Sequence, residues 1–227
     1  MLGRIEGFTG RSIDGKKSRI MALQDVAQSI SGLILACFML CHMIFTGTIL
    51  IGKGAFEGVV HFAEPGGIYF VTNIVAFVIF VIFVVHAFLA MRKFPANYAA
   101  YRAFKAHKMR MKHCDTTLWW FQFWTGFLLF FFAAAHILMI VFGPKITADL
   151  AIARFGQLHL FYFVLLIFVV THASIGIYRL YMKWISIDGT KAEIQRKRAL
   201  IKKTVFIVWG AFFLLSIIAD FKWLSLE

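Results

Sequence analysis

The stretch VAFVIFVIFVVHAFLAMR, residues 75–92, decides the fold class, because it is an apolar run of membrane-spanning length that contains one histidine. About 20 apolar residues in a helix cross the hydrocarbon core of a bilayer. A titratable side chain in hydrocarbon is costly, so its presence there indicates a function. His86 precedes Arg92 by six residues, which places it about 9 Å inside that end of the helix.

Four further apolar segments of similar length follow or precede this one. The chain has 227 residues, of which 61% are hydrophobic, and this composition is typical of a helical membrane protein. We therefore expect an all-α membrane protein, a single integral-membrane domain over residues 1–227 with five transmembrane helices. The five expected spans cover approximately residues 26–51, 68–91, 116–142, 157–182 and 204–221.

The distribution of positive charge predicts how the helices are oriented. A net charge of +13 could suggest nucleic acid as a partner, but the Lys and Arg residues lie between the apolar segments. They concentrate in the N-terminal segment, the second connection and the fourth connection. The positive-inside rule then places the N-terminus in the cytoplasm and the C-terminus outside, with the lipid bilayer, and no nucleic acid, as partner. The other side keeps only Lys53, Lys145, Arg154 and Lys222.

Topology assigns a depth to each of four intramembrane histidines. His42 and His136 lie on helices that run outward, eleven and nine residues before Lys53 and Lys145, so both are about 15 Å from the outer flank. His86 and His172 lie on helices that run inward, six and seven residues before a flanking arginine, about 10 Å from the cytoplasmic flank. The four histidines thus form an outer pair and an inner pair.

Paired imidazoles in a helical bundle are the arrangement that a bis-histidine haem requires. Closing both axial positions of the iron favours electron transfer over oxygen chemistry. We therefore expect four of the helices to form a bundle around two haems, one at each level. Gly32 and Gly126 each lie ten residues before an outer histidine, close to the inner level, and a missing side chain there would leave room for a macrocycle.

The glycines belong to a weak internal repeat, in which Gln28-x-x-Ser31-Gly32 precedes His42 as Gln122-x-x-Thr125-Gly126 precedes His136. Polar side chains near the two levels are candidates for binding haem propionates. Those at the cytoplasmic level are Gln28, Ser29, Arg92, Arg179 and Lys183, and Arg154 is a weaker candidate on the outer side.

Each histidine also has a structural interpretation. One transmembrane histidine is as often an interhelical hydrogen bond as a ligand, so a cofactor-free membrane anchor remains an alternative. A proton relay would also use buried histidines, but it would place Asp or Glu beside them, and none of the four histidine-bearing segments has one in its core. Four histidines at two matched depths favour the haem interpretation.

Several stretches also resemble a known family, the dihaem cytochrome b subunits of menaquinol:fumarate reductases and of succinate:menaquinone oxidoreductases with one five-helix anchor. The similarity extends over nearly the whole chain. It is carried by QSISGLILACFMLCHMIF, HAFLAMRKFPANY, KAHKMRMKHCDTTLWW and HASIGIYRLYMKW.

The resemblance implies two b haems, with His42 and His136 binding the distal iron and His86 and His172 the proximal one. It implies menaquinol as substrate, and a flavoprotein and an iron–sulfur subunit as partners on the cytoplasmic face. It further implies a multi-pass protein of the bacterial inner membrane and a dimer of heterotrimers. The expected function is menaquinol oxidation with electron transfer to the iron–sulfur subunit for fumarate reduction, and the chain alone would not act on fumarate.

Two positions depart from the family pattern. Some members carry a glutamate two residues before the last haem ligand, where this chain has Val170, so a transmembrane proton route of that kind is not expected. The acidic residue near the menaquinol site falls in a loop that is shorter here, and Glu64 or Glu57 could take that role, with Glu64 favoured. A dihaem cytochrome b of a hydrogenase or a formate dehydrogenase is the nearer alternative function.

Overall fold

The computed structural model describes residues 19–63, 70–111 and 113–227, and every regular element in that part of the chain is helical. Five of the described helices are long and apolar enough to cross a membrane, which confirms the expected fold class. They are α2 (Arg19–Gly47), α4 (Phe70–Met91), α6 (Cys114–Val141), α8 (His159–Trp184) and α9 (Lys191–Leu224).

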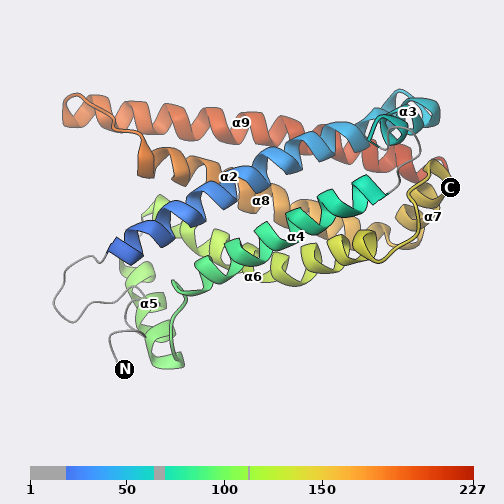
Figure 1. The fold of residues 1–227 in the computed structure, drawn as a ribbon. Helices are drawn as coiled ribbons and strands as arrows, with labels where there is room; N and C mark the ends of the chain where they lie inside the picture. Colours follow the sequence, from blue (N-terminus) through green and yellow to red (C-terminus); the bar gives the residue numbers. More distant parts are fainter. Residues whose placement is uncertain (1–18, 64–69, 112) are drawn as a thin grey trace.

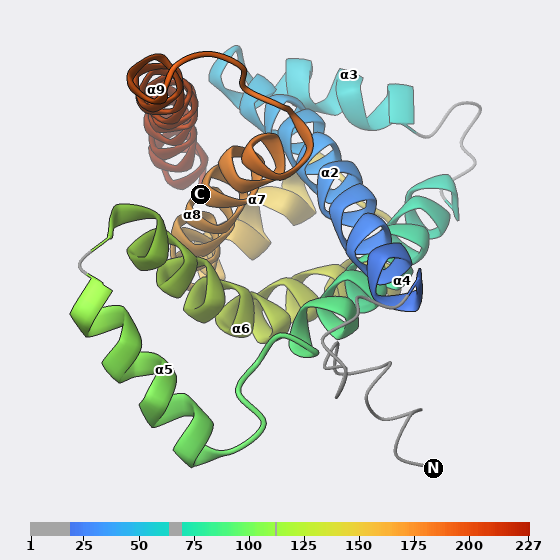
Figure 2. The ribbon, with the colours of Figure 1, turned by 90° about the vertical axis from the view of Figure 1, so that its left-hand side faces the viewer.

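The five long helices lie side by side and alternate in direction (Figure 1). α2 packs against α4, α4 against α6, α6 against α8, and α8 against α2, so four helices close a ring. Seen along the bundle, the same four helices surround its axis while α9 lies outside them (Figure 2). α9 packs against α8 and α2, where the buried Trp209 contacts the apolar core.

Helices α4, α6 and α8 begin and end within two residues of the expected spans, whereas two other helices begin well before theirs. α2 begins at Arg19 instead of residue 26, and α9 begins at Lys191 instead of residue 204. Thr190 and Glu193 form a reciprocal capping box that starts α9 in a polar segment. A 34-residue helix is about 51 Å long, so α9 extends well beyond a hydrocarbon core of about 30 Å.

Short helices lie at both ends of the bundle. α5 (Tyr98–Met111) forms in the basic connection between α4 and α6, at the same end as the start of α2 (Figure 1). The connection between α2 and α4 contains α3 (Lys53–Ala63), which follows the turn η1 (Thr48–Leu50). Gly52 has φ +145°, a conformation that favours glycine, and it allows the sharp turn between η1 and α3.

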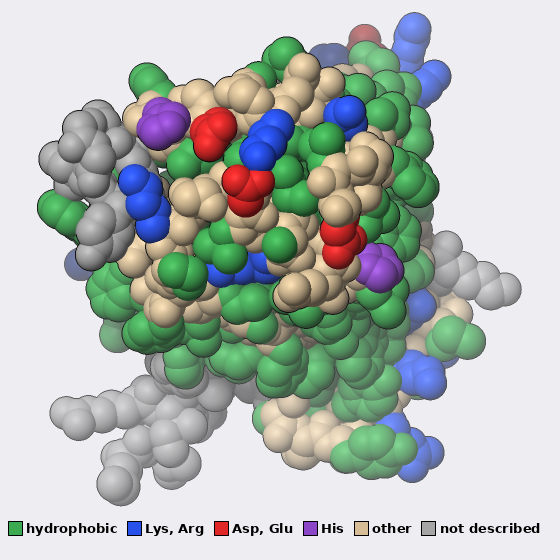
Figure 3. Space-filling view, turned by 90° about the vertical axis from the view of Figure 1, so that its right-hand side faces the viewer, with side chains coloured by type: hydrophobic (Ala, Val, Ile, Leu, Met, Phe, Trp, Pro, Cys, Tyr) green, Lys and Arg blue, Asp and Glu red, His purple; other side chains and the backbone are tan. Residues whose placement is uncertain are grey.

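An apolar cluster holds these elements together at the end of the bundle opposite α5. Phe56 of α3 packs edge-on against Trp223 of α9, with ring centroids 4.8 Å apart. Ile49 of η1 and Ile152 of α7 (Ala148–Gln157) are buried in the same cluster. The surface of this end carries acidic and basic side chains scattered over a mainly uncharged face (Figure 3). Tertiary packing against α9 therefore explains why this connection is helical.

Candidate functional site

One large cavity runs inside the bundle, bounded by the four ring helices and by one face of α9. Its volume is about 1470 Å³, more than the approximately 300–1,000 Å³ of an ordinary pocket for one ligand. All four intramembrane histidines line it, as do both glycines of the repeat. The cavity is therefore large enough for more than one bulky group and is lined by the residues singled out in the sequence.

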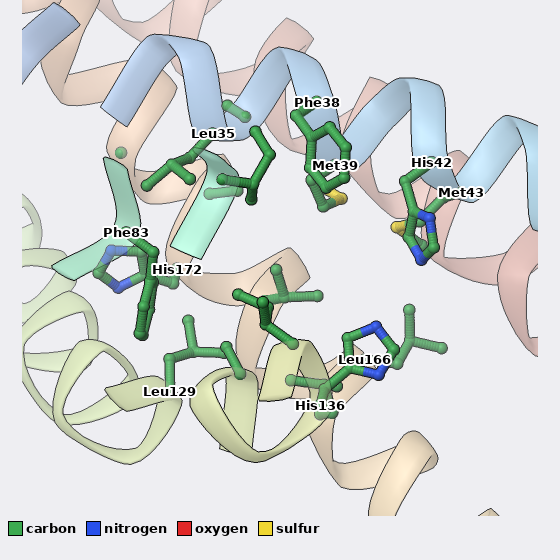
Figure 4. Close-up of a pocket in the computed structure, with 18 of the residues that line it drawn as sticks. Leu35, Phe38, Met39, His42, Met43, Phe83, Leu129, His136, Leu166 and His172 are labelled. Atoms are coloured by element: carbon green, nitrogen blue, oxygen red, sulfur yellow. The ribbon is translucent and has the colours of Figure 1, made fainter. Parts of the chain in front are cut away.

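The structure brings the histidines together in the two pairs that their depths indicated. The ring centroids of His42 and His136 are 6.0 Å apart, and those of His86 and His172 are 6.5 Å apart. His42 and His136 point toward one another from α2 and α6, whereas His172 lies at the other end of the view (Figure 4). Ten residues of α2 separate His42 from the glycine beside His86, so the levels lie about 15 Å apart.

These separations fit a metal held between each pair of imidazoles. Two metal–imidazole bonds of about 2 Å each, together with the two ring radii, place the centroids of axial imidazoles about 6 Å apart. No group of three or more His, Cys, Asp or Glu side chains with metal-site geometry occurs in the described chain. The donor set at each level is thus a pair of neutral nitrogens on opposite sides of a space, which suits an ion whose remaining ligands come from a macrocycle.

Hydrogen bonds fix the tautomer of the inner pair. The Nδ1 of His172 lies 3.1 Å from the Gln122 carbonyl oxygen, which can only accept, so Nδ1 carries the proton. The Thr125 hydroxyl lies 3.4 Å from the same Nδ1 and donates its own proton to the Phe121 carbonyl. The Nε2 lone pair of His172 is therefore free to bind a metal.

The equivalent contacts occur at His86, as the internal repeat predicts. Its Nδ1 lies 3.1 Å from the Ser31 hydroxyl, which donates to the Ala27 carbonyl at 2.8 Å and hence accepts from the histidine. Gly32 is next to the ring, since a Cβ at that position would lie 2.9 Å from Cε1 of His86. The close neighbour for which the glycine leaves room is an imidazole, where the sequence suggested a macrocycle, and Gly126 has the same relation to His172.

Aromatic rings take the place of hydrogen bonds around the outer pair. Phe38 stacks on His42 with ring centroids 5.8 Å apart, and Tyr162 meets His136 edge-on at 5.7 Å. The Nδ1 atom of His136 is buried without a hydrogen-bond partner among the described residues. A buried imidazole nitrogen without a partner costs free energy, so this atom is consistent with a site that a bound group completes.

The polar side chains that are candidates for binding haem propionates divide into those that line the cavity and one, Arg92, that does not. Gln28, Ser29, Arg154, Arg179 and Lys183 all line it. Arg179 donates to Gln122 Oε1 at 2.7 Å, and the Oε1 atom of Gln28 is buried without a described partner. These side chains can bind carboxylates at the two ends of the cavity.

Arg92 is held outside the cavity lining by Asp25, which sequence reasoning missed. The Arg92 guanidinium is nearly buried and donates to Asp25 and to Gln24. The same carboxylate lies 3.2 Å from the Lys93 amine and 3.3 Å from that of Lys183. Burial and then the neighbouring cations, Lys183 first, lower the pKa of Lys93 to about 8. Asp25 is thus the anion that balances this cluster of cations between α2, α4 and α8.

The structure also bears on the positions at which the sequence departs from the family pattern. Val170 is buried in an apolar cluster with Met39, Leu166 and Trp209, so the position of the family's glutamate is occupied by apolar packing. Glu64, the favoured quinol proton acceptor, lies outside the described residues. Glu57 lies in α3 and does not line the cavity.

Comparison with known proteins finds relatives that match most of this chain and that share one name. Residues 99–212 match the family model described as succinate dehydrogenase/fumarate reductase transmembrane subunit. The fumarate reductase cytochrome b subunit of Wolinella succinogenes is 38% identical over 218 residues, which cover 90% of this chain and 85% of the relative. The subunit of the same name from Helicobacter pylori is 42% identical over 215 residues, covering 91% of this chain and 84% of the relative.

Proposed function

Because the chain belongs to the family of succinate dehydrogenase and fumarate reductase transmembrane subunits, we propose that it oxidises menaquinol and passes the electrons through two b haems to an iron–sulfur subunit. As a multi-pass membrane subunit of a redox enzyme complex, it has a flavoprotein and an iron–sulfur protein as partners. The relatives are named fumarate reductase subunits, which favours this partner over a hydrogenase or a formate dehydrogenase.

The separation of the paired imidazoles is the observation that carries the proposal. His42 with His136 would hold the outer haem and His86 with His172 the inner one, at centroid separations of 6.0 and 6.5 Å. A haem held by these histidines would supply one-electron transfer without binding oxygen or substrate. The chain orients the inner imidazoles through Ser31, Thr125 and Gln122.

The side chains between the outer and the inner histidine pairs suit a second role, which is to exclude water from the space between the two pairs. Leu35, Phe38 and Met39 of α2 line the stretch between the outer and the inner histidines (Figure 4). Apolar walls lower the local dielectric and limit the access of solvent to the site. Gln28, Arg179 and Lys183 at one end and Arg154 at the other would bind propionates.

The proposed location is the bacterial inner membrane with the N-terminus in the cytoplasm and the complex present as a dimer of heterotrimers. Oxidation of menaquinol also needs a proton acceptor, for which Glu64 remains our candidate from the sequence. Replacing Glu64 by Gln should abolish quinol oxidation while both haems stay bound. Unchanged turnover would remove Glu64 from the mechanism.

A reduced-minus-oxidised visible spectrum of the purified complex, with haem counted per polypeptide, tests the proposal. We expect two low-spin b haems, and one haem after His42→Ala or His86→Ala, because each variant removes a ligand from a single level. His61→Ala, a histidine of α3 that does not line the cavity, is the matched control and should retain both haems. Absence of haem from the wild-type complex would return the four histidines to a structural role.

A further inference from the structure

A carboxylate on α9 lines the outer part of the cavity and has no assigned role. Asp220 sits near the end of α9, and its Oδ2 atom is buried without a hydrogen-bond partner among the described residues. A carboxylate in an apolar protein interior is costly when it is unpaired. Accepting a proton, or a hydrogen bond from a hydroxyl, removes that cost.

Asp220 is one of two carboxylates that line the cavity in the described part of the chain, and the other already has an ion-pair partner and a hydrogen-bond donor. Asp115 pairs with Lys202 and accepts from the Tyr178 hydroxyl at 3.2 Å. The stripe of α9 that lines the cavity recurs at helical spacing, so Asp220 faces inward with Phe212, Ser216 and Trp223.

Aromatic contacts connect this stripe to the outer histidine pair. Trp223 lies three residues after Asp220, and its ring centroid is 5.9 Å from that of Phe155. Phe155 stacks on Tyr162 at 5.4 Å, and Tyr162 meets His136 at 5.7 Å. Asp220 and the outer pair therefore border the same end of the cavity, with flat aromatic rings between them.

This end of the cavity is also open to the apolar surface. Phe45, Leu50 and Leu215 line the cavity and are each more than 40% exposed. They come from α2, η1 and α9, which contact one another. A ligand with a polar ring and a long apolar tail could enter from the bilayer between these elements, with its ring toward Asp220.

We propose that Asp220 is a catalytic residue that takes a proton from the hydroxyl of a quinol bound between α9 and the outer histidine pair. The inference rests on the proposed function. Oxidation of a quinol to a quinone breaks two O–H bonds and releases two electrons and two protons. The electrons leave to the oxidised metal centres of the complex, Asp220 takes one proton, and water takes the other.

The test compares Asp220→Asn with wild type in the purified complex. The variant should keep both haems and should still reduce fumarate with reduced benzyl viologen, which bypasses the quinol. Its menaquinol oxidation should fall by about 10²-fold or more, the usual contribution of a general base. The matched control is Asp149→Asn, which alters an exposed carboxylate of α7 paired with Lys53 and should leave quinol oxidation unchanged. Unchanged quinol oxidation in Asp220→Asn would overturn the proposal.

Infrared difference spectra of the wild-type complex give a readout that does not depend on a folded variant. With the aspartates labelled by carbon-13, quinol oxidation should produce a shifted carboxylic-acid band, which Asp220→Asn should lack. A wild-type spectrum without an aspartate band would overturn the role of Asp220, even if Asp220→Asn loses its haems. A wild-type complex that contains no haem or does not oxidise menaquinol would instead defeat the proposed function.

Discussion

Hydrogen-bond partners on the neighbouring helix, a hydroxyl and a backbone carbonyl, determine the orientation of the inner imidazole rings. The hydroxyls of Ser31 and Thr125 each donate to their own helix and leave an oxygen lone pair for Nδ1–H of the opposite histidine. Small residues follow both hydroxyls, so the ring can approach the helix closely. The orientation of a ligand is thus determined by residues that do not bind the metal.

Removing one of these hydroxyls should loosen the inner site without abolishing it. For Ser31→Ala we expect the affinity of the inner haem to fall by about 10- to 100-fold, because His86 loses the acceptor that fixes its ring. Haem retained per polypeptide during dialysis against a haem-binding protein measures this. Ser174→Ala removes an equally buried hydroxyl that bonds the Thr171 carbonyl, and it should behave as wild type. Equal haem loss from both variants would contradict the orienting role.

Adding one methyl group at Gly32 should displace the inner histidine. A Cβ there would lie 2.9 Å from Cε1 of His86, closer than packed carbons tolerate, so the ring must move away from its partner. Gly32→Ala should therefore reduce the haem count from two to one in the visible spectrum. Gly210→Ala is the matched control, since no atom beyond its chain neighbours and its own helix backbone lies within 4 Å of its Cβ position, and alanine favours a helix by about 1 kcal/mol. Two intact haems in Gly32→Ala would show that His86 tolerates displacement.

At the level of elements, the ring of four helices consists of two hairpins with equivalent contacts. In each, a hydroxyl and a glycine on the first helix contact the histidine of the second, in α2 with α4 and in α6 with α8. The internal repeat of the sequence therefore has a physical basis in the packing of small residues against imidazole rings. α9 falls outside this repeat and instead closes the cavity with one face.

A shared carboxylate ties three of these helices together at the end that contains α5. Asp25→Asn should lower the free energy of unfolding by about 2 kcal/mol, because the nearly buried Arg92 loses its charged partner. The expected loss is smaller than for a fully buried pair, since the Asp25 side chain is 37% exposed. Thermal unfolding in detergent measures the change.

The control for this prediction is Asp149→Asn, which breaks a solvent-exposed pair with Lys53 at the opposite end of the bundle. Such pairs contribute about 0–1 kcal/mol, so this variant should unfold close to the wild-type temperature. If both variants unfold at the same temperature, Asp25 does not hold α2 against α4 and α8.

At the scale of the whole molecule, the two ends of the bundle differ in charge. The end with α5 also carries the extension of α9 beyond the membrane, which contains Lys191, Arg196, Lys197, Arg198, Lys202 and Lys203. The opposite end, with α3 and α7, has few positive charges spread over a mainly uncharged face (Figure 3). This asymmetry supports a cytoplasmic position for the α5 end.

Labelling of single cysteines should establish this orientation. In a variant whose three cysteines, Cys37, Cys41 and Cys114, are replaced by alanine, Ser186→Cys lies between α8 and α9 and Ser225→Cys lies at the end of α9. A membrane-impermeant thiol reagent should label Ser225→Cys in intact spheroplasts and Ser186→Cys only in inverted vesicles. The reverse pattern would place the N-terminus outside.

The apolar segments and the histidine depths could be predicted from the sequence because both depend on local properties. The length of an apolar run determines whether a helix can span a bilayer, and a rise of about 1.5 Å per residue converts sequence distance into depth. The spacing of Gly32 from His42 placed this glycine at the level of His86 for the same reason.

Other features depend on contacts between residues far apart in the chain, and the tertiary structure determined them. Helix α3 is stabilised by Phe56 packing on Trp223, and Asp25 gains its importance from Arg92, which follows α4, and from Lys183 of α8. In the sequence Asp220 is a carboxylate near a helix end, whereas the fold places its Oδ2 atom against an apolar cavity without a hydrogen-bond partner among the described residues. Burial and hydrogen-bond satisfaction arise from the packing of the whole bundle, so no local pattern in the sequence could reveal them.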